Sequence, residues 1–418
     1  MSKNARDRRP YVKPVQRVEL SEINVKLRMI LIVLLLSIAV VAVIYGLFSL
    51  LNTEPGWQEV EVSSSDTNCS ADFVLMYEFG KDGVDATTEA KNVNRMYTYL
   101  TEVIYQTFSA ETEAEVGNVY ALNRHPNETV SVAHDLYKAL ELVVEYDSRY
   151  PFMAPVTAAY GAVFLSANDE EAALYDPMCN AEQMAYVQET AAYCADPEMI
   201  HVELLGDDQV RLVIAQEYLD YAEENEIETF LDFGWLTNAF IIDEIADTLA
   251  ASGYTHGYIA SYDGFTRNLD DRGNSYSFNI FHRTDGDVYM PARLDYSGPM
   301  SIVSLRDYPM TEEDQWHYHA YGDGKITTVF LDPADGKSKS SVDGLTAYSD
   351  NMGCAEILLK TAPVFIADSF DAYALETLEK EGIHSVRCYN KGVVFTQENA
   401  AVTLLEEEYS LVHSVSEE

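Results

Sequence analysis

An acidic turn and a later carboxylate are the residues whose types and spacing first point to chemistry in this chain. The turn is LDPADG, residues 331–336, in which Asp332 and Asp335 stand on either side of a Pro-Ala pair and Gly336 follows. Asp350 comes about fifteen residues after Asp335, at the head of an apolar run with helical spacing. Asp-Pro is a common turn starter and Asp is a favoured helix N-cap, so a hairpin turn and a cap explain both features. The alternative is that both belong to one nucleotide and metal site.

Two histidines are a second candidate for chemistry. His317 and His319 alternate in QWHYHAY, residues 315–321, as side chains on one face of a strand do. Two such imidazoles can bind a metal ion, but no third ligand stands near them in the sequence, so exposure or packing is the favoured interpretation. The chain has no GxSxG, HExxH, P-loop or Rossmann fingerprint, which argues against the enzyme classes that depend on those motifs.

The elements that must position these residues are predicted from hydrophobic periodicity and turn residues. Apolar residues at helical spacing predict a helix over 88–108, and Ser131 is placed to cap a second helix. Polar, alanine-rich helical sequence fills residues 168–198. Hairpins are predicted at 201–215 and 275–290, each around a Gly and Asp turn.

A strand–turn–helix–strand unit is predicted over residues 230–264. Its first strand leads into a Gly turn, and its helix stops at Gly253. The helix has one apolar face, made by Phe240, Ile241, Ile245 and Leu249. A helix over 368–381 and two short strands near 384–396 follow later in the chain. Because helices and strands alternate irregularly, we expect an α+β domain with mixed α and β structure rather than a regular doubly wound sheet.

The N-terminal part predicts a retained membrane anchor. Residues 29–51 carry no charge over 23 positions, and about 20 apolar residues suffice for a helix to span a bilayer. This run is too long for the core of a cleaved signal peptide. Residues 1–28 hold eight Lys or Arg and three acids, and positive residues stay on the cytoplasmic side. We expect a cytoplasmic basic segment (1–28), a single-pass transmembrane helix (29–51), a linker (52–69), an extracytoplasmic domain (70–405) and an acidic tail (406–418), all held at the cell membrane.

The remainder of the chain is strongly acidic. The 418 residues include 27 Lys or Arg and 69 Asp or Glu, and residues 29–418 keep 19 of these bases and 66 of these acids. Such a surface repels nucleic acid and anionic lipid, so nucleic-acid binding is excluded as a function. The five cysteines show no metal-site spacing. In an extracytoplasmic domain Cys179 and Cys194 can pair across a short segment, and the odd count leaves at least one thiol free.

Four segments, in order, resemble motifs of the FAD:protein FMN transferase (ApbE) family. Leu122-Asn123, Val130-Ser131 and FMAPV (152–156) resemble its Leu-Asn, its Val-Ser helix start and its Phe-Asp-Pro-Thr-Val turn. FLDFGWLTNAFIIDEIADTLAASG (230–253) resembles its Leu-Gly-Gly-Ile-Ala-Lys-Gly-Tyr-Ala-Val-Asp helix. VFLDPADGKSKSSV (329–342) resembles its His-Ile-Ile-Asp-Pro-x-Thr-Gly, and LTAYSDNMGCAEILL (345–359) resembles its Ala-Asp-Ala-Leu-Ser-Thr-Ala-Leu helix.

The resemblance implies the T-fold-like ApbE architecture, a place outside the cytoplasmic membrane, FAD binding and a need for Mg²⁺. Members of the family move the FMN half of FAD onto a Thr hydroxyl of an acceptor flavoprotein and release AMP. Mg²⁺ takes carboxylate and phosphate oxygens and neutralises charge on the transferring group. The implied metal ligands are Asp350 and Cys354, and the implied catalytic residues are Asp350 and Asp332. The implied cofactor-binding residues are Gly234, Trp235, Asn238, Asp243, Asp263, Gly264, Asp332 and Gly336.

Several residues of the family pattern are replaced in this chain. Asn238 stands where the family has Lys, so a cationic contact is absent, and Arg267 and Lys325 are candidates to replace it. Trp235 stands for a Gly, and it either stacks on a flavin or adenine ring or simply packs. The other replacements are Val329 for a His, Cys354 for a Thr, Asp335-Gly336 for Thr-Gly and Tyr262-Asp263-Gly264 for a Gly-Gly-Asp turn.

Three functions are left open by the sequence. The first is a membrane-anchored FMN transferase that acts on extracytoplasmic redox proteins. The second is a catalytically degenerate protein of the same fold that binds flavin or a partner without transfer. The third is an anchored structural domain that shares only the architecture.

Overall fold

The computed structural model describes residues 32–40, 53–62, 67–81, 83–311, 314, 316–396 and 400–413. The chain divides into two compact units, Met1–Thr53 and Glu54–Glu418. Residues 32–40 are helical, and the rest of the predicted span over 29–51 lies outside the described residues, so the membrane anchor stays a prediction. Within the described part of the chain, no helix has the length and apolarity that crossing a bilayer requires.

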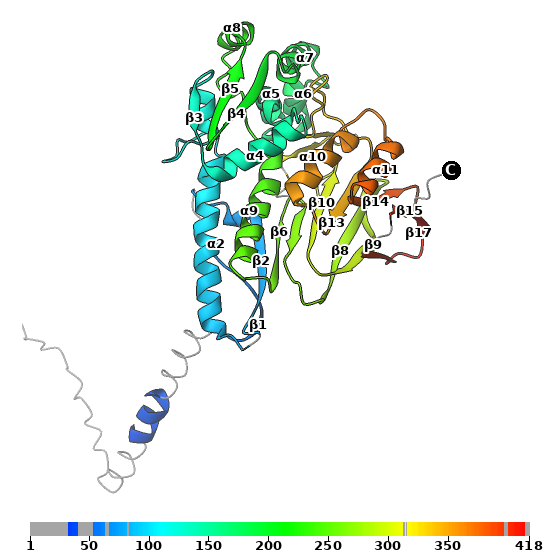
Figure 1. Ribbon diagram of the computed structural model, residues 1–418. Helices are drawn as coiled ribbons and strands as arrows, with labels where there is room; N and C mark the ends of the chain where they lie inside the picture. The colour runs from blue at the N-terminus through cyan, green and yellow to red at the C-terminus, as the bar shows by residue number, and fades with distance from the viewer. Residues whose placement is uncertain are drawn as a thin grey trace, which may run out of the picture. The chain divides into compact units, whose positions relative to one another are not determined.

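The unit Glu54–Glu418 is built on a large sheet (Figure 1). The strand order is β1-β2-β6-β7-β10-β13-β14-β15-β17, in which β15 and β17 pair in parallel and the other neighbours pair antiparallel. The strands are β1 (Gly56–Glu59), β2 (Phe73–Phe79), β6 (Gly257–Ser261), β7 (Phe265–Asn268), β10 (Met300–Arg306), β13 (Gly344–Ser349), β14 (His384–Tyr389), β15 (Gly392–Phe395) and β17 (Ser410–His413). Strand β1 lies in the segment predicted as a linker, and β17 lies in the segment predicted as an acidic tail.

Helices cover one face of this sheet, and a second sheet covers part of the other. The helices are α2 (Ala86–Phe108), α9 (Thr237–Ala251), α10 (Cys354–Phe365) and α11 (Ala372–Lys380) (Figure 1). The second sheet has the order β16-β9-β8, with β8 (Ser275–Thr284), β9 (Asp287–Ser297) and β16 (Ala400–Leu404). One apolar core lies under the helices, and a smaller one lies between the two sheets, around Leu294, Ile302 and Tyr348.

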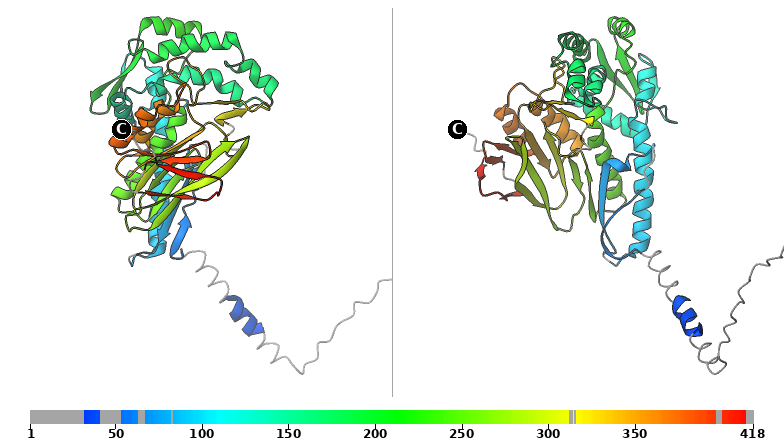
Figure 2. Two further views of the ribbon diagram at one scale, coloured as in Figure 1. Left: turned by 90° about the vertical axis from the view of Figure 1, so that its right-hand side faces the viewer. Right: turned by 180° about the vertical axis from the view of Figure 1, so that it is seen from behind.

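A third layer of helices and short strands gathers at one end of the unit (Figure 2). It contains α3 (Val119–Arg124), β3 (Thr129–Ser131), α4 (His134–Glu145), α5 (Ala154–Phe164), α6 (Asp169–Tyr175), α7 (Ala181–Ala195), β4 (Ile200–Gly206), β5 (Gln209–Ile214) and α8 (Gln216–Glu224). The hairpin of β11 (Tyr318–Ala320) and β12 (Ile326–Thr328) comes just before the acidic turn in the chain. Short 3-10 turns at Ser70–Asp72, Tyr150–Met153 and Gly234–Leu236 precede β2, α5 and α9.

The long helix, both hairpins and the C-terminal helix and strands are confirmed. The cap at Ser131 is wrong: Ser131 ends β3 opposite Gln209, and α4 begins three residues later. The strand before Gly234 is also wrong. The side-chain oxygen of Asn123 accepts the N–H groups of Phe230 and Leu231, each at 2.9 Å. These two backbone groups therefore bond to a side chain and not to the backbone of a neighbouring strand.

The pairing of Cys179 with Cys194 that the sequence left open is not formed, because all five cysteines are free. The thiol of Cys194 is fully buried in α7, 3.4 Å from the hydroxyl of Tyr218, while Cys179 is exposed before that helix begins. The mixed α and β fold class itself is confirmed.

Candidate functional site

A cavity of about 690 Å³ lies where β2 begins and where β6 and β10 end, beside the first turn of α9. We call it the Asp263 cavity. Its lining includes charged, amide and aromatic side chains from segments far apart in the sequence, among them Asp72, Asn238, Tyr262, Asp263, Arg306 and His317. Antiparallel pairing of β2 with β6, and of β10 with β7, brings these segments together.

Only one of the two carboxylate oxygens of Asp263 has a hydrogen-bond partner. Its Oδ2 accepts a hydrogen bond of 3.1 Å from the side-chain amide of Asn238. Its Oδ1 is buried and has no hydrogen-bond partner within the part of the chain that the structure describes. Burial raises the pKa of Asp263, while the nearby Ser261, His317 and Asn238 act in the opposite direction. Native proteins pair almost all such buried polar atoms, so this oxygen is one of the exceptions among the described residues.

Asp72 faces the same cavity from the neighbouring strand. The backbone N–H of Tyr262 donates to the carbonyl of Asp72 at 3.1 Å, which continues the β2–β6 ladder by one residue beyond Phe73. Burial raises the pKa of Asp72, and the negative charge of Asp263 raises it further. Asp72 and Asp263 therefore form a pair of interacting carboxyl groups.

A cation and an imidazole line the same cavity as these carboxyl groups. Arg306 ends β10, and its guanidinium lies 3.5 Å from Asp314. The Nε of Arg306 is buried with no partner among the residues described. The backbone carbonyl of His317 accepts the N–H of Val329 at 3.1 Å, which extends the β11–β12 pairing and places His317 directly across from Val329.

Two aromatic side chains are exposed at the cavity. Tyr262 has an exposed fraction of 62% and Trp316 one of 57%. They are two of the eight exposed aromatic side chains among the described residues, and aromatic rings are the usual platforms for planar ring systems. The cavity thus combines ring-stacking surfaces with a cation and unpartnered polar atoms.

Asp243 has a different position from the one implied by the resemblance. It lies on α9, where its carboxylate pairs with Arg267 and accepts the backbone N–H groups of Cys354 and Ala355, both at 2.8 Å. It joins α9 to the start of α10 and does not line the Asp263 cavity. Arg267 forms ion pairs with Asp243 and Asp247, and Lys325 forms one with Asp176. Neither residue therefore replaces the missing cation beside Asn238.

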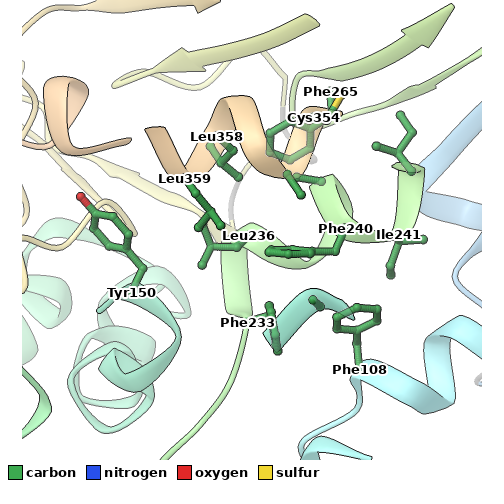
Figure 3. Packing of buried hydrophobic residues seen from close by; sticks show 14 of the residues in the cluster. Phe108, Tyr150, Phe233, Leu236, Phe240, Ile241, Phe265, Cys354, Leu358 and Leu359 are labelled. Atoms are coloured by element: carbon green, nitrogen blue, oxygen red, sulfur yellow. The ribbon is translucent and has the colours of Figure 1, made fainter. Parts of the chain in front are cut away.

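The residues implied as metal ligands do not fit a hard cation together. Cys354 is fully buried in the apolar core beside Phe265 (Figure 3), and its thiol faces the carbonyl oxygens of Thr266 and Ile302. Burial raises the pKa of Cys354 well above its usual value, so the thiol stays protonated. Asp350 is exposed, and it does not cap α10, because the N-cap is Gly353. No group of three or more His, Cys, Asp or Glu suited to a metal ion is found among the described residues.

The acidic turn that opened the sequence argument is held by a lysine. Lys339 Nζ lies 2.8 Å from Asp332, 3.1 Å from Asp335 and 2.9 Å from Asp368. Gly336 has a φ of +69°, and a Cβ atom there would lie 2.6 Å from a methyl carbon of Val187 in α7. The turn is therefore neutralised and packed within the protein, and it does not line the Asp263 cavity.

The implied cofactor residues separate into two groups. Asn238 and Asp263 line the cavity. Trp235 packs edge-on against Tyr150 and Phe330, with ring centroids 5.7 and 5.1 Å away, so the packing interpretation is the one observed. At Gly264 a Cβ atom would lie 2.4 Å from the carbonyl of Ser304, so this glycine lets β10 approach, whereas a Cβ at Gly234 would meet open space.

Sequence reasoning missed most of the cavity. Asp72, Arg306, Asp314 and Trp316 carry no motif, and His317 was interpreted as a surface or packing residue. The available signal was positional, because Tyr262-Asp263 stands at the end of the strand predicted after Gly253. Which strands pair was not readable from the sequence.

The chain has no match among protein-family models and none among curated proteins. Its structure is similar to that of the ApbE protein from Thermotoga maritima, with a TM-score of 0.54 and 15% identity, covering 83% of this chain and 96% of that one. It is also similar to the flavin transferase ApbE from Vibrio cholerae, with a TM-score of 0.53 and 12% identity, covering 84% and 97%. This chain therefore has the fold of the ApbE flavin transferases.

Proposed function

We propose that this protein binds FAD in the Asp263 cavity and transfers the FMN half to a Thr hydroxyl of an extracytoplasmic redox protein, with release of AMP. The observation that carries the proposal is the cavity itself. On an ApbE-like fold it joins two exposed aromatic side chains to a guanidinium and a carboxylate that both have buried, unpartnered atoms. Its volume of about 690 Å³ lies in the range of sites for small organic ligands.

The cavity residues suit the parts of a dinucleotide. The rings of Tyr262 and Trp316 offer faces on which a flavin or adenine ring can stack. Arg306 lines the cavity, and a guanidinium is well shaped for phosphate oxygens. Trp235 has no part in this recognition, because Tyr150 and Phe330 already enclose it.

Transfer needs a group that accepts the proton of the attacking hydroxyl. The Thr oxygen forms a bond to the phosphorus of the FMN half, the bond from that phosphorus to the AMP oxygen breaks, and AMP leaves with the electron pair. His317 lines the cavity, and an imidazole is suited to take the hydroxyl proton near neutral pH. We assign this role to His317, with the carboxylate of Asp263 nearby to stabilise the imidazolium.

Binding without transfer is the second candidate, and two observations favour it. Val329, at the position of a family His, is a buried apolar residue with an exposed fraction of 5%. Cys354, at the position of a family Thr, is enclosed in the core and cannot reach a ligand. If His317 does not supply the base, the same cavity would hold a flavin nucleotide that is never cleaved.

The test uses the full-length protein, FAD titration calorimetry with and without Mg²⁺, and a Thr-containing acceptor peptide whose flavinylation is read by mass spectrometry. We expect FAD binding, weakened in Trp316→Ala and Tyr262→Ala, and transfer that is lost in His317→Ala while binding is kept. Tyr373→Ala, at an exposed tyrosine of α11, is the matched control. Absence of FAD binding at high micromolar concentration contradicts the proposal, and binding without transfer in the wild type selects the second candidate.

We also propose that residues 29–51 anchor the protein in the cell membrane with the N-terminus in the cytoplasm. The support is the uncharged run of 23 residues after a segment with eight bases and three acids. The expected result is that the protein stays with membranes after alkaline extraction and that residues after 51 are open to protease from the outer side. Release by alkaline extraction contradicts the anchor.

A further inference from the structure

We propose that a second cavity, at one end of the large sheet, binds a small molecule that carries a phosphate group. Its volume is about 800 Å³, and we call it the Arg387 cavity. Its lining consists of residues 282–284 at the end of β8, 341–343 before β13, Phe370 before α11, and 387–391 of the β14–β15 hairpin. It shares no lining residue with the Asp263 cavity, so the proposal does not rest on flavin transfer.

Strand pairing brings these segments to the same end of the sheet. Arg387 of β14 is paired with Leu345, the second residue of β13, so residues 341–343 lie beside the end of β14. The backbone N–H of Asp307, just after β10, donates to the carbonyl of Asp343 at 2.9 Å. From β8, the Nε2 of His282 lies 3.9 Å from the carboxylate of Asp343. The cavity is therefore walled by strand ends in a fixed register.

The lining has the opposite charge balance from the rest of the chain. It contains three bases, Arg283, Arg387 and Lys391, and one acid, Asp343. Residues 29–418 as a whole contain 19 bases and 66 acids. Because the field of distant charges is screened by salt while that of nearby charges is not, bases gathered around one cavity create a local site for an anion on an otherwise acidic surface.

Arg387 is a half-buried cation without a counter-charge. Its guanidinium lies over the ring of Phe370, 4.1 Å from the centroid, and it makes no ion pair or hydrogen bond with the residues that the structure describes. Burial lowers the pKa of Arg387, while Tyr389 and Cys388 act in the opposite direction. Other arginines of the described chain each pair with a carboxylate, namely Arg124, Arg211, Arg267, Arg272, Arg293 and Arg306. Since a buried charge is costly unless it is paired, an anion from outside the chain is the partner that Arg387 lacks.

Stacking also prepares this guanidinium for a ligand. A guanidinium that lies on an aromatic ring has a fixed plane, and its N–H donors point outward from the edge of that plane. Arg283, the next-to-last residue of β8, is a second half-buried guanidinium at the same cavity. It too has no ion pair within the described part of the chain. The cavity therefore offers two guanidinium groups that are both open to an anion.

The acids around these bases do not neutralise them fully. Lys391 pairs with Glu408 outside the lining. The carboxylate of Asp307, behind the lining, accepts a hydrogen bond of 2.7 Å from Ser340, and burial raises its pKa to about 6 although Arg283 opposes this shift. Asp343 is 54% exposed and is the acid that faces a ligand. It is expected to weaken anion binding without preventing it.

A phosphate group fits this lining better than a single carboxylate. A phosphate monoester carries about two negative charges near neutral pH and has three terminal oxygens. Two guanidinium groups can each donate a pair of N–H bonds to such a group, whereas one carboxylate satisfies one guanidinium. The hydroxyl of Thr284 and the amide of Asn390 offer further donors. Nucleic acid and anionic bilayers are repelled by the acidic surface, so the occupant is a free small molecule.

The test is calorimetric titration of the full-length protein with inorganic phosphate, phenyl phosphate and succinate, in the absence of FAD. We expect saturable binding of both phosphates, with succinate weaker. Arg387→Gln and Arg283→Gln should each weaken binding by roughly tenfold or more, because each removes charged hydrogen bonds. Asp343→Asn should strengthen binding by about threefold, because it removes the negative charge that faces the ligand. Damage to the fold cannot produce this increase.

Controls separate this site from other arginines. Arg293→Gln, at a β9 arginine outside the lining that pairs with Asp295, should leave phosphate affinity unchanged. If Arg387→Gln does not fold, Arg283→Gln and Asp343→Asn still decide the question.

Three results would overturn the proposal: no saturable phosphate binding, affinity unaffected by Arg283→Gln and Arg387→Gln, or tighter binding of succinate than of phosphate. A loss caused only by Arg306→Gln would place the phosphate in the Asp263 cavity and overturn it as well. FAD binding is expected to survive Arg387→Gln, so failure of this site and failure of the transferase are distinguishable.

Discussion

The carboxylate of Asp243 accepts the backbone N–H groups of both Cys354 and Ala355 at 2.8 Å, and so it caps α10 from another helix 111 residues earlier in the chain. The N-cap residue, Gly353, has no side chain to do this. A Cβ atom on Gly353 would lie 2.4 Å from the Asp243 carboxylate, so the glycine is what allows the approach. Arg267 forms an ion pair with the same carboxylate.

Loss of the Asp243 carboxylate should destabilise the domain strongly. Asp243→Ala leaves Arg267 and two helix N–H groups without their partner, and breaking a largely buried pair costs about 3–5 kcal/mol. The free energy of unfolding from urea denaturation is the measurement. Gly353→Ala should reproduce much of the effect by pushing the carboxylate away. Asp247→Asn is the control, because Asp247 pairs with the same Arg267 but its side chain is 65% exposed; it should cost no more than about 1 kcal/mol. Equal costs for Asp243 and Asp247 would contradict the capping role.

Local patterns predicted the elements of this fold well, and non-local pairing decided the rest. Helix 88–108 and the hairpin at 275–290 were predicted because periodicity and turn residues act within a few positions. Ser131 was misassigned because its strand pairing with Gln209, far along the chain, overrides its preference for a helix cap.

The candidate site shows the same limit. Asn238 and Asp263 were found by resemblance, but Asp72 joins them only because β2 pairs with β6, whose sequence lies nearly two hundred residues away. The cap interpretation of Asp350, left open beside its implied metal role, rested on its position before an apolar run, while the carboxylate that caps this helix is Asp243. Such contacts depend on sheet order, which the sequence of one chain does not reveal.

Gly336 should tolerate no side chain. Its φ of +69° disfavours an L residue, and a Cβ atom would lie 2.6 Å from Val187. Backbone strain and overpacking together predict that Gly336→Ala lowers the free energy of unfolding by about 2–4 kcal/mol. Gly324→Ala is the matched control, since Gly324 has a φ of +91° but open space around a Cβ, so only strain of about 1–2 kcal/mol applies. In a Val187→Ala background the cost of Gly336→Ala should shrink, and an unchanged cost would show that the contact with α7 is irrelevant.

Lys339 should be the residue that keeps the acidic turn folded. Its side chain is 11% exposed and contacts Asp332, Asp335 and Asp368. Lys339→Met leaves these carboxylates to repel one another, and it should lower the free energy of unfolding by about 2 kcal/mol at low salt, with partial recovery as salt screens the charges. Lys337→Met removes a more exposed amine that pairs with Asp335 alone, and it should cost about 0.5 kcal/mol. Denaturation at two ionic strengths measures both, and a loss that is independent of salt would contradict the charge explanation.

Asp307 should make the domain less stable as pH rises from about 4 to 6. Burial raises its pKa from 3.8 to about 6, and the charge of Asp343 adds to the shift while Ser340 donates a hydrogen bond of 2.7 Å that opposes it. The folded state therefore binds a proton more tightly than the unfolded state, so stability is highest when the carboxyl is protonated and falls as pH rises through this window. Asp307→Asn removes the titrating charge, and it should raise the free energy of unfolding above pH 6 by about 1–3 kcal/mol with little gain near pH 4. Thermal unfolding of both proteins from pH 4 to pH 8 checks this, with Asp343→Asn, at a side chain 54% exposed, as the control expected to show a smaller change. Parallel stability profiles for wild type and Asp307→Asn would show that this carboxyl does not titrate in the window.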